Sequence, residues 1–220
     1  ALASWHPDEY GMYECQAIKS TQGDLTERRD YRQKIHEYVV PHSHAKHAET
    51  EQGAYMVGAL ARYRCNKEQL HPAALAVADR LQLDSYLFNP YAITLAQVVE
   101  TVHSVEEAIR YLEWTLGREL EWEDWGVKPR AGRGVGVDEA PRGLLIHDYT
   151  FDDDGKLTAV NCIIPTNQNL NNIERDFHAL VPQIIDRPDA EIQLLLEMLV
   201  RAYDPCISCA THLLRVEIKR

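Results

Sequence analysis

The sequence of 220 residues contains no long hydrophobic run. No apolar segment approaches the roughly 18 to 20 residues that a membrane-spanning helix needs, so we expect no membrane span. The first ten residues, ALASWHPDEY, show neither the basic nor the apolar segment of a secretory signal peptide. They also lack an initiator methionine, which leaves open a processed chain, a trimmed chain or a piece of a longer protein.

Basic residues are scarce relative to acidic ones. The chain has 23 Lys and Arg against 34 Asp and Glu, a formal net charge of −11. No basic stripe offsets this balance, which argues against binding to a nucleic-acid phosphate backbone. The hydrophobic fraction of 45% is typical of a globular protein. Because no repeat or low-complexity linker interrupts the chain, we predict a single domain over residues 1–220.

Cysteines are few and odd in number. The five stand at positions 15, 65, 162, 206 and 209, a pattern that argues against the disulfide framework of a small secreted domain. Only Cys206 and Cys209 form a local motif. We therefore expect a reducing compartment, the cytoplasm, and a pair of thiols that bind metal or act in redox chemistry rather than staple the fold.

Hydrophobic periodicity predicts a mainly α fold with a small antiparallel β-hairpin, an α+β class. Apolar spacing indicates helices over residues 68–83, 93–116, 170–185 (interrupted at Pro182) and 190–203, the last of them buried. Two strand-like runs around DDDG predict the hairpin over 144–164. Residues 1–50 suggest loops and short elements, and residues 118–141 an irregular connection.

The segment DPCISCATH at 204–212 carries the strongest chemical signal. Thiols two residues apart can turn both sulfurs toward one soft or borderline metal ion. His212 is close enough to add a ligand, and Asp204 can accept a hydrogen bond or a proton beside the site. Half of a structural zinc site, a redox motif and two ordinary buried thiols remain alternatives. A closed metal site needs about four ligands, so the others must come from elsewhere, another chain included.

Three segments together resemble the large subunit of nickel–iron hydrogenases. DPCISCATH resembles its D-P-C-x-x-C-x-x-H motif; EAPRG at 139–143, with the strands and the PTNQN turn that follow, resembles a second motif; and GAYMVGALAR at 53–62 is a weaker match. The segments occur in the family's order. The R-x-C-G-x-C motif of the family's N-terminal half has no counterpart, so the chain resembles the C-terminal half, in its cytoplasmic, multisubunit branch. A split subunit, a fragment and a degenerate homologue are the possible explanations.

The resemblance assigns metal ligands. Cys206 matches the terminal thiolate on nickel, and Cys209 the thiolate that bridges nickel and iron. His212 matches a ligand of a nearby magnesium or iron ion, and the backbone carbonyl of Cys162 falls where the family offers a further oxygen to that ion. The implied cofactor is a nickel–iron centre with CO and cyanide ligands on iron, with no organic cofactor on this chain.

The resemblance also assigns polar groups around that centre. Arg142 matches an arginine suspended over the open face of the cluster and in contact with cyanide, Thr166 a hydroxyl that donates to cyanide, and Asp204 the carboxylate that holds the arginine. Arg142, Cys206 and Asp204 are thus the expected catalytic residues. A guanidinium keeps its charge and donates with a planar fork.

The implied activity is the heterolytic cleavage of H2, with electrons passing to iron–sulfur clusters. The expected partners are the missing N-terminal half, an iron–sulfur small subunit and further electron-transfer subunits. Two alternatives remain: a non-catalytic structural or quinone-site homologue of the complex I type, and a zinc-stapled helical module. The pair Cys206 and Cys209 favours the enzyme over the first of these.

Other residues are interpreted without a catalytic role. The cluster of His42, His44 and His47 is expected to be a polar loop, because no acid or cysteine stands at ligand spacing in the sequence. Several further residues are expected to serve the fold alone: Cys15 and Cys65 as ordinary thiols, Trp114, Trp122 and Trp125 in packing, Asp152–Asp154 in a hairpin turn, and Gly132, Gly134 and Gly136 in a flexible loop. Residues 213–220 are expected to form a retained strand.

Overall fold

The computed structural model describes residues 1–124, 126 and 128–210. Its α-helices are α1 (Ala59–Asn66), α2 (Pro72–Arg80), α3 (Ala92–Leu116), α4 (Pro165–Ile184), α5 (Asp189–Ala202) and α6 (Ile207–Ala210). Short 3-10 helices cover Arg28–Gln33, Lys67–Gln69 and Leu83–Tyr86. The strands are β1 (Leu2–Trp5), β2 (Ala17–Ser20), β3 (Leu25–Glu27), β4 (His36–Tyr38), β5 (His47–Glu49), β6 (Gly132–Ala140), β7 (Gly143–Phe151) and β8 (Leu157–Ile163). The α+β class is confirmed.

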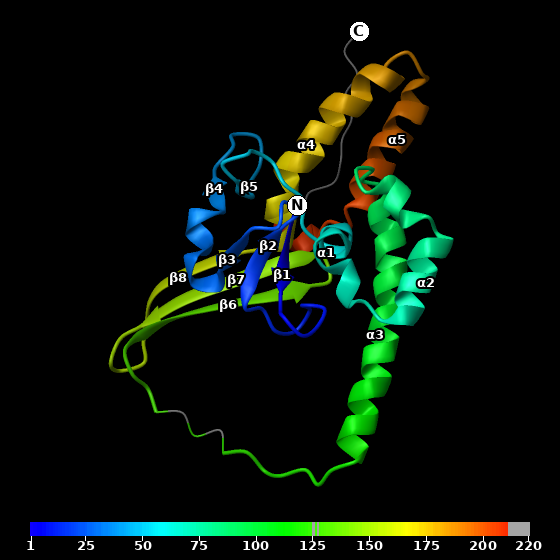
Figure 1. The fold of residues 1–220 in the computed structure, drawn as a ribbon. Coiled ribbons are helices and arrows are strands. Elements are labelled where there is room, and N and C mark those ends of the chain that lie inside the picture. Colours follow the sequence, from blue (N-terminus) through cyan, green and yellow to red (C-terminus); the bar gives the residue numbers. More distant parts are fainter. Residues whose placement is uncertain (125, 127, 211–220) are drawn as a thin grey trace.

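The strands form three antiparallel sheets in the order β1-β2-β3, β4-β5 and β6-β7-β8. Figure 1 shows them gathered beside α1–α3, while α4 and α5 form a helical hairpin at one end of the molecule. The hairpin predicted over 144–164 is confirmed as β7 and β8, which pair from Ile146↔Ile163 to Phe151↔Leu157. Its turn is the predicted one: the amides of Asp154 and Lys156 both donate to the Asp152 carboxylate.

The irregular connection predicted over 118–141 is wrong in its second half. Residues 132–140 form β6, which pairs with β7 along its whole length. The three glycines expected in a flexible loop, Gly132, Gly134 and Gly136, lie in this strand. Glycine is a poor strand former, and its alternation with Arg133 and Val135 conceals the period of a strand in the sequence.

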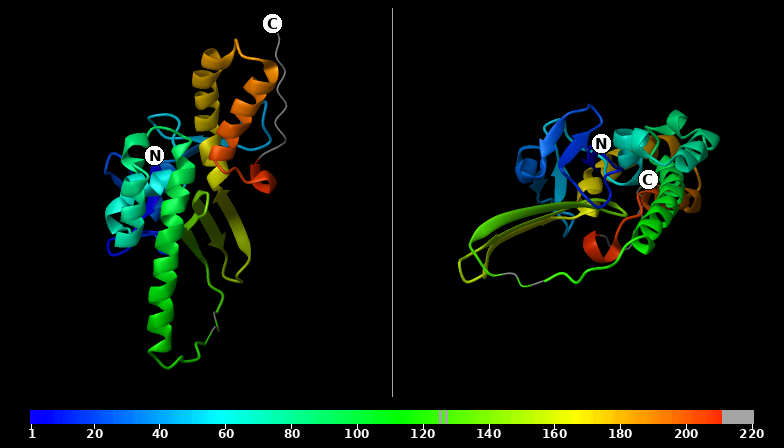
Figure 2. Two further views of the ribbon diagram at one scale, coloured as in Figure 1. Left: turned by 90° about the vertical axis from the view of Figure 1, so that its right-hand side faces the viewer. Right: turned by 60° about the horizontal axis from the view of Figure 1, so that its bottom comes forward.

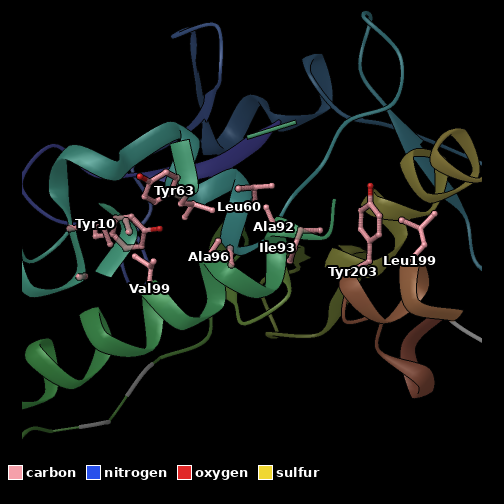
Figure 3. Packing of buried hydrophobic residues seen from close by; sticks show 14 of the residues in the cluster. Tyr10, Leu60, Tyr63, Ala92, Ile93, Ala96, Val99, Leu199 and Tyr203 are labelled. Carbon is pink, nitrogen blue, oxygen red and sulfur yellow. The ribbon is translucent and has the colours of Figure 1, made fainter. Parts of the chain in front are cut away.

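A helical core holds α1, α2, α3 and α5 together. Its buried side chains include Leu60, Ala96 and Leu199, all at most 1% exposed. Figure 3 shows residues from the N-terminal segment, α1, α3 and α5 meeting in this cluster, with Tyr10 at one end and Tyr203 and Leu199 at the other. Each such burial of a large apolar side chain stabilises the fold by about 1.5–3 kcal/mol.

A second core joins the N-terminal segment to the sheet β6–β8. The polar stretch 1–50 contributes Ile18, Tyr31, Ile35 and Ala48, and they pack with buried residues of the sheet such as Ile146. The short elements expected over 1–50 are therefore strands and a 3-10 helix that close one face of the sheet.

The predicted helices are confirmed with shifted ends. The helix over 93–116 is α3, and that over 190–203 is α5. Only one side of α5 is buried, however, since Leu194 and Met198 are 51% and 44% exposed. Residues 68–83 contain a 3-10 turn and the shorter α2. The helix α4 begins at Pro165 and continues through Pro182, which does not interrupt it.

The C-terminal part of α3 carries an exposed apolar face. Figure 2 shows this part of the helix extending beyond the elements that surround its first half. Val105, Ile109 and Leu112 lie along one side of the helix and are 47–63% exposed. Trp114 and Trp122 are 55% and 92% exposed, so the packing role predicted for them is wrong within the chain itself; Trp125 lies outside the described residues. Among the described residues, no helix combines the length and apolar character needed to cross a membrane.

Candidate active site

Arg142 occupies the tight turn between β6 and β7. Ala140 pairs with Gly143 across the hairpin, so only Pro141 and Arg142 form the connection. Gly143 has φ +132, and a Cβ there would lie 2.5 Å from a methyl of Val57. On the opposite side Gly58 has φ +103, and a Cβ there would lie 2.9 Å from the Arg142 carbonyl oxygen. The turn therefore needs glycine at both positions to approach the start of α1.

A buried arginine supports the same turn from beneath. Arg62 of α1 is 1% exposed. Its guanidinium donates to both oxygens of Glu100 at 2.6 Å and to Glu139 at 2.7 Å. It also donates to the carbonyls of Ala140 and Pro141 at 3.1 and 3.0 Å. These bonds tie α1 and α3 to the residues immediately before Arg142.

The electrostatics of this cluster follow from burial and pairing. Burial alone would lower the pKa of Arg62, but the carboxylates of Glu100 and Glu139 outweigh it and hold the pKa well above its usual range. Burial raises the pKa of Glu139 to about 7, although Arg62 opposes that rise. The cluster thus has one fixed cation, which two carboxylates share.

The Arg142 side chain reaches the segment that follows α5. Its Nε donates to the Asp204 carbonyl at 2.7 Å, and one terminal nitrogen lies 3.2 Å from the Asp204 carboxylate. Both side chains are 40% exposed. Asp204 has φ +48, a left-handed conformation that turns the chain sharply after the helix. Gln97 of α3 donates to the other carboxylate oxygen at 3.4 Å.

Thr166 fixes the first cysteine. The amide of Cys206 donates to Thr166 Oγ1 at 3.1 Å, and Thr166, in the first turn of α4, is 3% exposed. Because this bond uses Oγ1 as the acceptor, the hydroxyl proton of Thr166 can serve a further acceptor. The structure thus brings Arg142, Thr166, Asp204 and Cys206 together from distant parts of the chain.

Cys206 and Cys209 form a disulfide in the structure, with their Cα atoms 5.3 Å apart. This differs from the separate thiolates expected from the sequence, since metal ligation requires the reduced pair. The reason is local: the motif opens the short helix α6, and the Cys209 amide donates to the Cys206 carbonyl at 3.2 Å. One turn with this spacing places both sulfurs on the same side, which suits a disulfide and a metal clamp alike.

Two predicted site residues are not joined to this group by any described contact. The Cys162 sulfur lies in β8 beside the Tyr149 hydroxyl at 3.7 Å and His147 Nδ1 at 3.9 Å. His212, together with the tail over 213–220, lies outside the described residues. Cys15 and Cys65 are buried free thiols, as expected.

The histidine loop has an acid partner that spacing in the sequence does not reveal. His42 and His47 both contact the Glu174 carboxylate, which lies more than 120 positions later in α4. An acid partner at ligand distance therefore exists, although none exists at ligand spacing in the sequence.

Sequence reasoning also missed the supporting arginine. Arg62 stands in the apolar run ALARYRC of α1, and an arginine on the buried face of a helix must find carboxylate partners. That signal was available, but its partners Glu100 and Glu139 are 38 and 77 positions away, and sequence spacing does not reveal such distant pairs.

The donor set suits a soft metal centre. Two neighbouring sulfurs, once reduced, provide soft ligands, while a guanidinium and a hydroxyl-bearing residue lie around them. Two sulfurs are half of what a closed site needs. The residues therefore fit one side of such a centre.

Comparison with known proteins gives one consistent result. The family model of the nickel-dependent hydrogenases matches residues 12–212. The chain is 34% identical over 215 residues to the sulfhydrogenase 1 subunit alpha of Pyrococcus furiosus, covering 95% of this chain and 48% of that protein. It is 31% identical over 181 residues to the NAD-reducing hydrogenase HoxS subunit beta of Cupriavidus necator, covering 74% of this chain and 35% of that protein.

A solved structure agrees with these relatives. The crystal structure of an NAD+-reducing [NiFe]-hydrogenase in the H2-reduced state matches with a TM-score of 0.73 and 28% identity, covering 96% of this chain and 50% of that one. The chain thus spans about half the length of these proteins or less. The matched range includes both the turn that carries Arg142 and the motif that carries Cys206. The chain belongs to the nickel-dependent hydrogenase family.

Proposed function

We propose that this chain is the C-terminal half of a nickel–iron hydrogenase catalytic subunit and takes part in the reversible, heterolytic cleavage of H2. The observation that carries the proposal is the convergence of two motifs. The Arg142–Asp204 contact and the Thr166–Cys206 bond hold the EAPRG turn, the start of α4 and the C-x-x-C segment against one another.

Cys206 and Cys209, in reduced form, would hold the nickel–iron centre, with Cys206 as a ligand of nickel and Cys209 as the second sulfur ligand. When bound, the centre supplies the soft metal pair at which H2 is split, with CO and cyanide ligands on iron. The bond from the Cys206 amide to Thr166 fixes the backbone from which the Cys206 sulfur extends. That sulfur is the proposed group that receives the proton.

Arg142 is proposed to stand over the open side of the centre. Its Nε is committed to the Asp204 carbonyl, and one terminal nitrogen to the Asp204 carboxylate. A guanidinium has five N–H donors, so N–H groups remain that can donate to a cyanide. Asp204 orients the Arg142 guanidinium. The Thr166 hydroxyl is proposed to donate its proton to a cyanide ligand.

The remaining ligands are proposed to come from outside the described residues. Two further thiolates would belong to the missing N-terminal half, and His212 with the Cys162 carbonyl would hold a magnesium or iron ion. The exposed apolar face of α3 supports this proposal. Val105, Ile109 and Leu112 form an apolar stripe, and the exposure of such a stripe to water is unfavourable. We propose that the other half of the subunit covers it, because the relatives are about twice as long.

The electron path and the location belong to the same proposal. Electrons would pass to iron–sulfur clusters of a small subunit and then to further subunits, in a complex of the cytoplasm. The support is the likeness to multisubunit hydrogenases, among them one whose name describes NAD reduction.

Metal analysis of the native complex tests the proposal. We expect nickel bound to this chain in about equimolar amount, together with H2 turnover. Cys209→Ser should lose both, because a hard oxygen replaces a soft bridging sulfur. Cys65→Ser, a change at a buried thiol that bonds to the Lys19 carbonyl, is the matched control and should keep both. Zinc without nickel, or full turnover in Cys209→Ser, would refute the assignment.

A further inference from the structure

A second group of metal-ligating side chains lies away from the cysteine motif. His42 belongs to the loop between β4 and β5, His47 begins β5, and Glu174 lies in the middle of α4. Nε2 of His42 lies 2.6 Å from Glu174 Oε1, and Nε2 of His47 lies 3.0 Å from the same oxygen. The three ligand atoms all lie within 4.8 Å of one another.

One side chain of this group is buried and the other two are exposed. The His47 side chain is 3% exposed, whereas His42 is 60% and Glu174 40% exposed. In a tetrahedral site with bonds of about 2.0–2.1 Å, ligand atoms lie about 3.3 Å apart. Small rotations of the two more exposed side chains would open the observed distances to that value around a fixed His47.

The contacts within the cluster are of the kind that a metal ion can replace. The Nε2 atoms of His42 and His47 both face the Glu174 carboxylate, and a metal ion would take the place of the protons in these contacts, because ligation requires a neutral imidazole. In the described part of the chain, Nδ1 of His47 has no hydrogen-bond partner. No bond at Nδ1 therefore fixes the tautomer, and the ring can present its Nε2 lone pair.

We propose that His42, His47 and Glu174 form a binding site for a divalent transition metal, with Zn2+ the best match. Two imidazoles and one carboxylate are an established ligand set for zinc, with the fourth position left to water. A metal there would tie the 39–46 loop and β5 to α4. Because metal-bound histidines usually donate from their second nitrogen, the unpartnered Nδ1 predicts a site about 10- to 100-fold weaker than a fully supported one.

The alternative is a plain imidazolium–carboxylate contact. The chain contains such a pair for comparison: His71 Nε2 lies 2.8 Å from Glu107, but only one imidazole meets that carboxylate. A metal site requires the third ligand, whereas an ion pair does not. The two interpretations therefore predict different metal affinities for otherwise similar pairs.

The test uses the full chain with Cys206→Ser and Cys209→Ser, so that the cysteine motif contributes no sulfur. Zn2+ binding is measured by calorimetry at pH 7.5, and the ligand field by the visible absorption of added Co2+. We expect one zinc per chain at the cluster and a tetrahedral Co2+ spectrum. His47→Gln and Glu174→Gln should each weaken binding at least tenfold, and His71→Gln should leave it unchanged.

His42→Gln is a variant that should fold normally, because the His42 side chain is largely exposed. It too should weaken binding tenfold or more. No Zn2+ binding, or binding that survives all three cluster substitutions, would overturn the proposal and leave an ion pair only. Since the Cys206 and Cys209 thiols are absent from every variant, the result does not depend on the proposed hydrogenase function.

Discussion

The substitution Arg62→Met tests whether one buried arginine supports the turn that carries Arg142. Methionine fills a similar volume but donates no hydrogen bond. The change removes three bonds to the carboxylates of Glu100 and Glu139 and two bonds to the carbonyls of Ala140 and Pro141. The buried carboxylates then have no cation.

The expected cost is large because the site is closed to water. Arg62 is 1% exposed, and the Glu139 side chain is 0% exposed. Removing one partner of a buried, hydrogen-bonded charge pair costs about 3–5 kcal/mol in free energy of unfolding. For a protein of this size that corresponds to a fall in Tm of about 6–20 °C. Arg201→Met is the control, since Arg201 makes an exposed i,i+4 pair with Glu197 and should cost less than about 1 kcal/mol.

The loss should also depend on pH. Burial raises the pKa of Glu139 from 4.5 to about 7, and Arg62 opposes that rise. A carboxyl whose pKa is raised in the fold contributes stability below its unfolded pKa, and this contribution is lost as pH rises through the folded pKa. Without Arg62 the folded pKa of Glu139 rises further, so the variant should lose more stability at pH 8 than at pH 5.

Urea unfolding at pH 5 and pH 8, followed by circular dichroism, measures both effects. A destabilisation as small as that of Arg201→Met, or one equal at the two pH values, would refute the view that Arg62 neutralises buried carboxylates. Loss of H2 turnover in the assembled complex should accompany the instability, because the residues beside Arg142 lose their anchor.

Three further predictions concern the same region. Gly143→Ala should cost about 1–3 kcal/mol in urea unfolding, because φ is +132 and the new methyl would meet Val57, whereas Gly134→Ala has open space and should be nearly neutral. Arg142→Lys should retain nickel but lower H2 turnover by about a hundredfold, since the planar fork is lost; unchanged turnover would remove it from the site. Arg133 and other donors hold the pKa of Asp148 well below its usual range. The free energy of unfolding should therefore fall on acidification below about pH 4. Asp148→Asn should flatten that pH dependence in acid titrations followed by fluorescence.

The contact between Arg142 and Asp204 could be predicted because each residue stands in a short motif. DPCISCATH and EAPRG contain Cys206, Asp204 and Arg142, and the structure brings the arginine to the aspartate. Long periodic helices such as α3 could also be predicted from the sequence, because their apolar stripe repeats over many turns.

The rest depended on contacts between distant residues. Neither the pairing of Arg62 with Glu139 nor that of His47 with Glu174 leaves a pattern at short spacing. The strand β6 was missed because its alternate residues are glycines, which carry no hydrophobic signal. Pro182 suggested a helix break, yet α4 continues past it to Ile184. Ile184 packs against Ile192 and Leu196 of α5, and this packing offsets the roughly 3 kcal/mol that proline costs in a helix interior.

The position of Arg142 shows how the two cores cooperate in one site. Its turn belongs to the sheet β6–β7, while Arg62 of α1 and Glu100 of α3 anchor that turn to the helical core. Asp204, its partner, follows α5. A guanidinium can be placed reproducibly only if the backbone before it and the acceptor beyond it are both fixed. Here the first condition is met by a buried charge cluster and the second by a left-handed turn. Substitutions that loosen the charge cluster around Arg62 or the turn at Asp204 should therefore lower H2 turnover more than they lower metal content. The reason is that neither Arg62 nor Arg142 is among the proposed metal ligands.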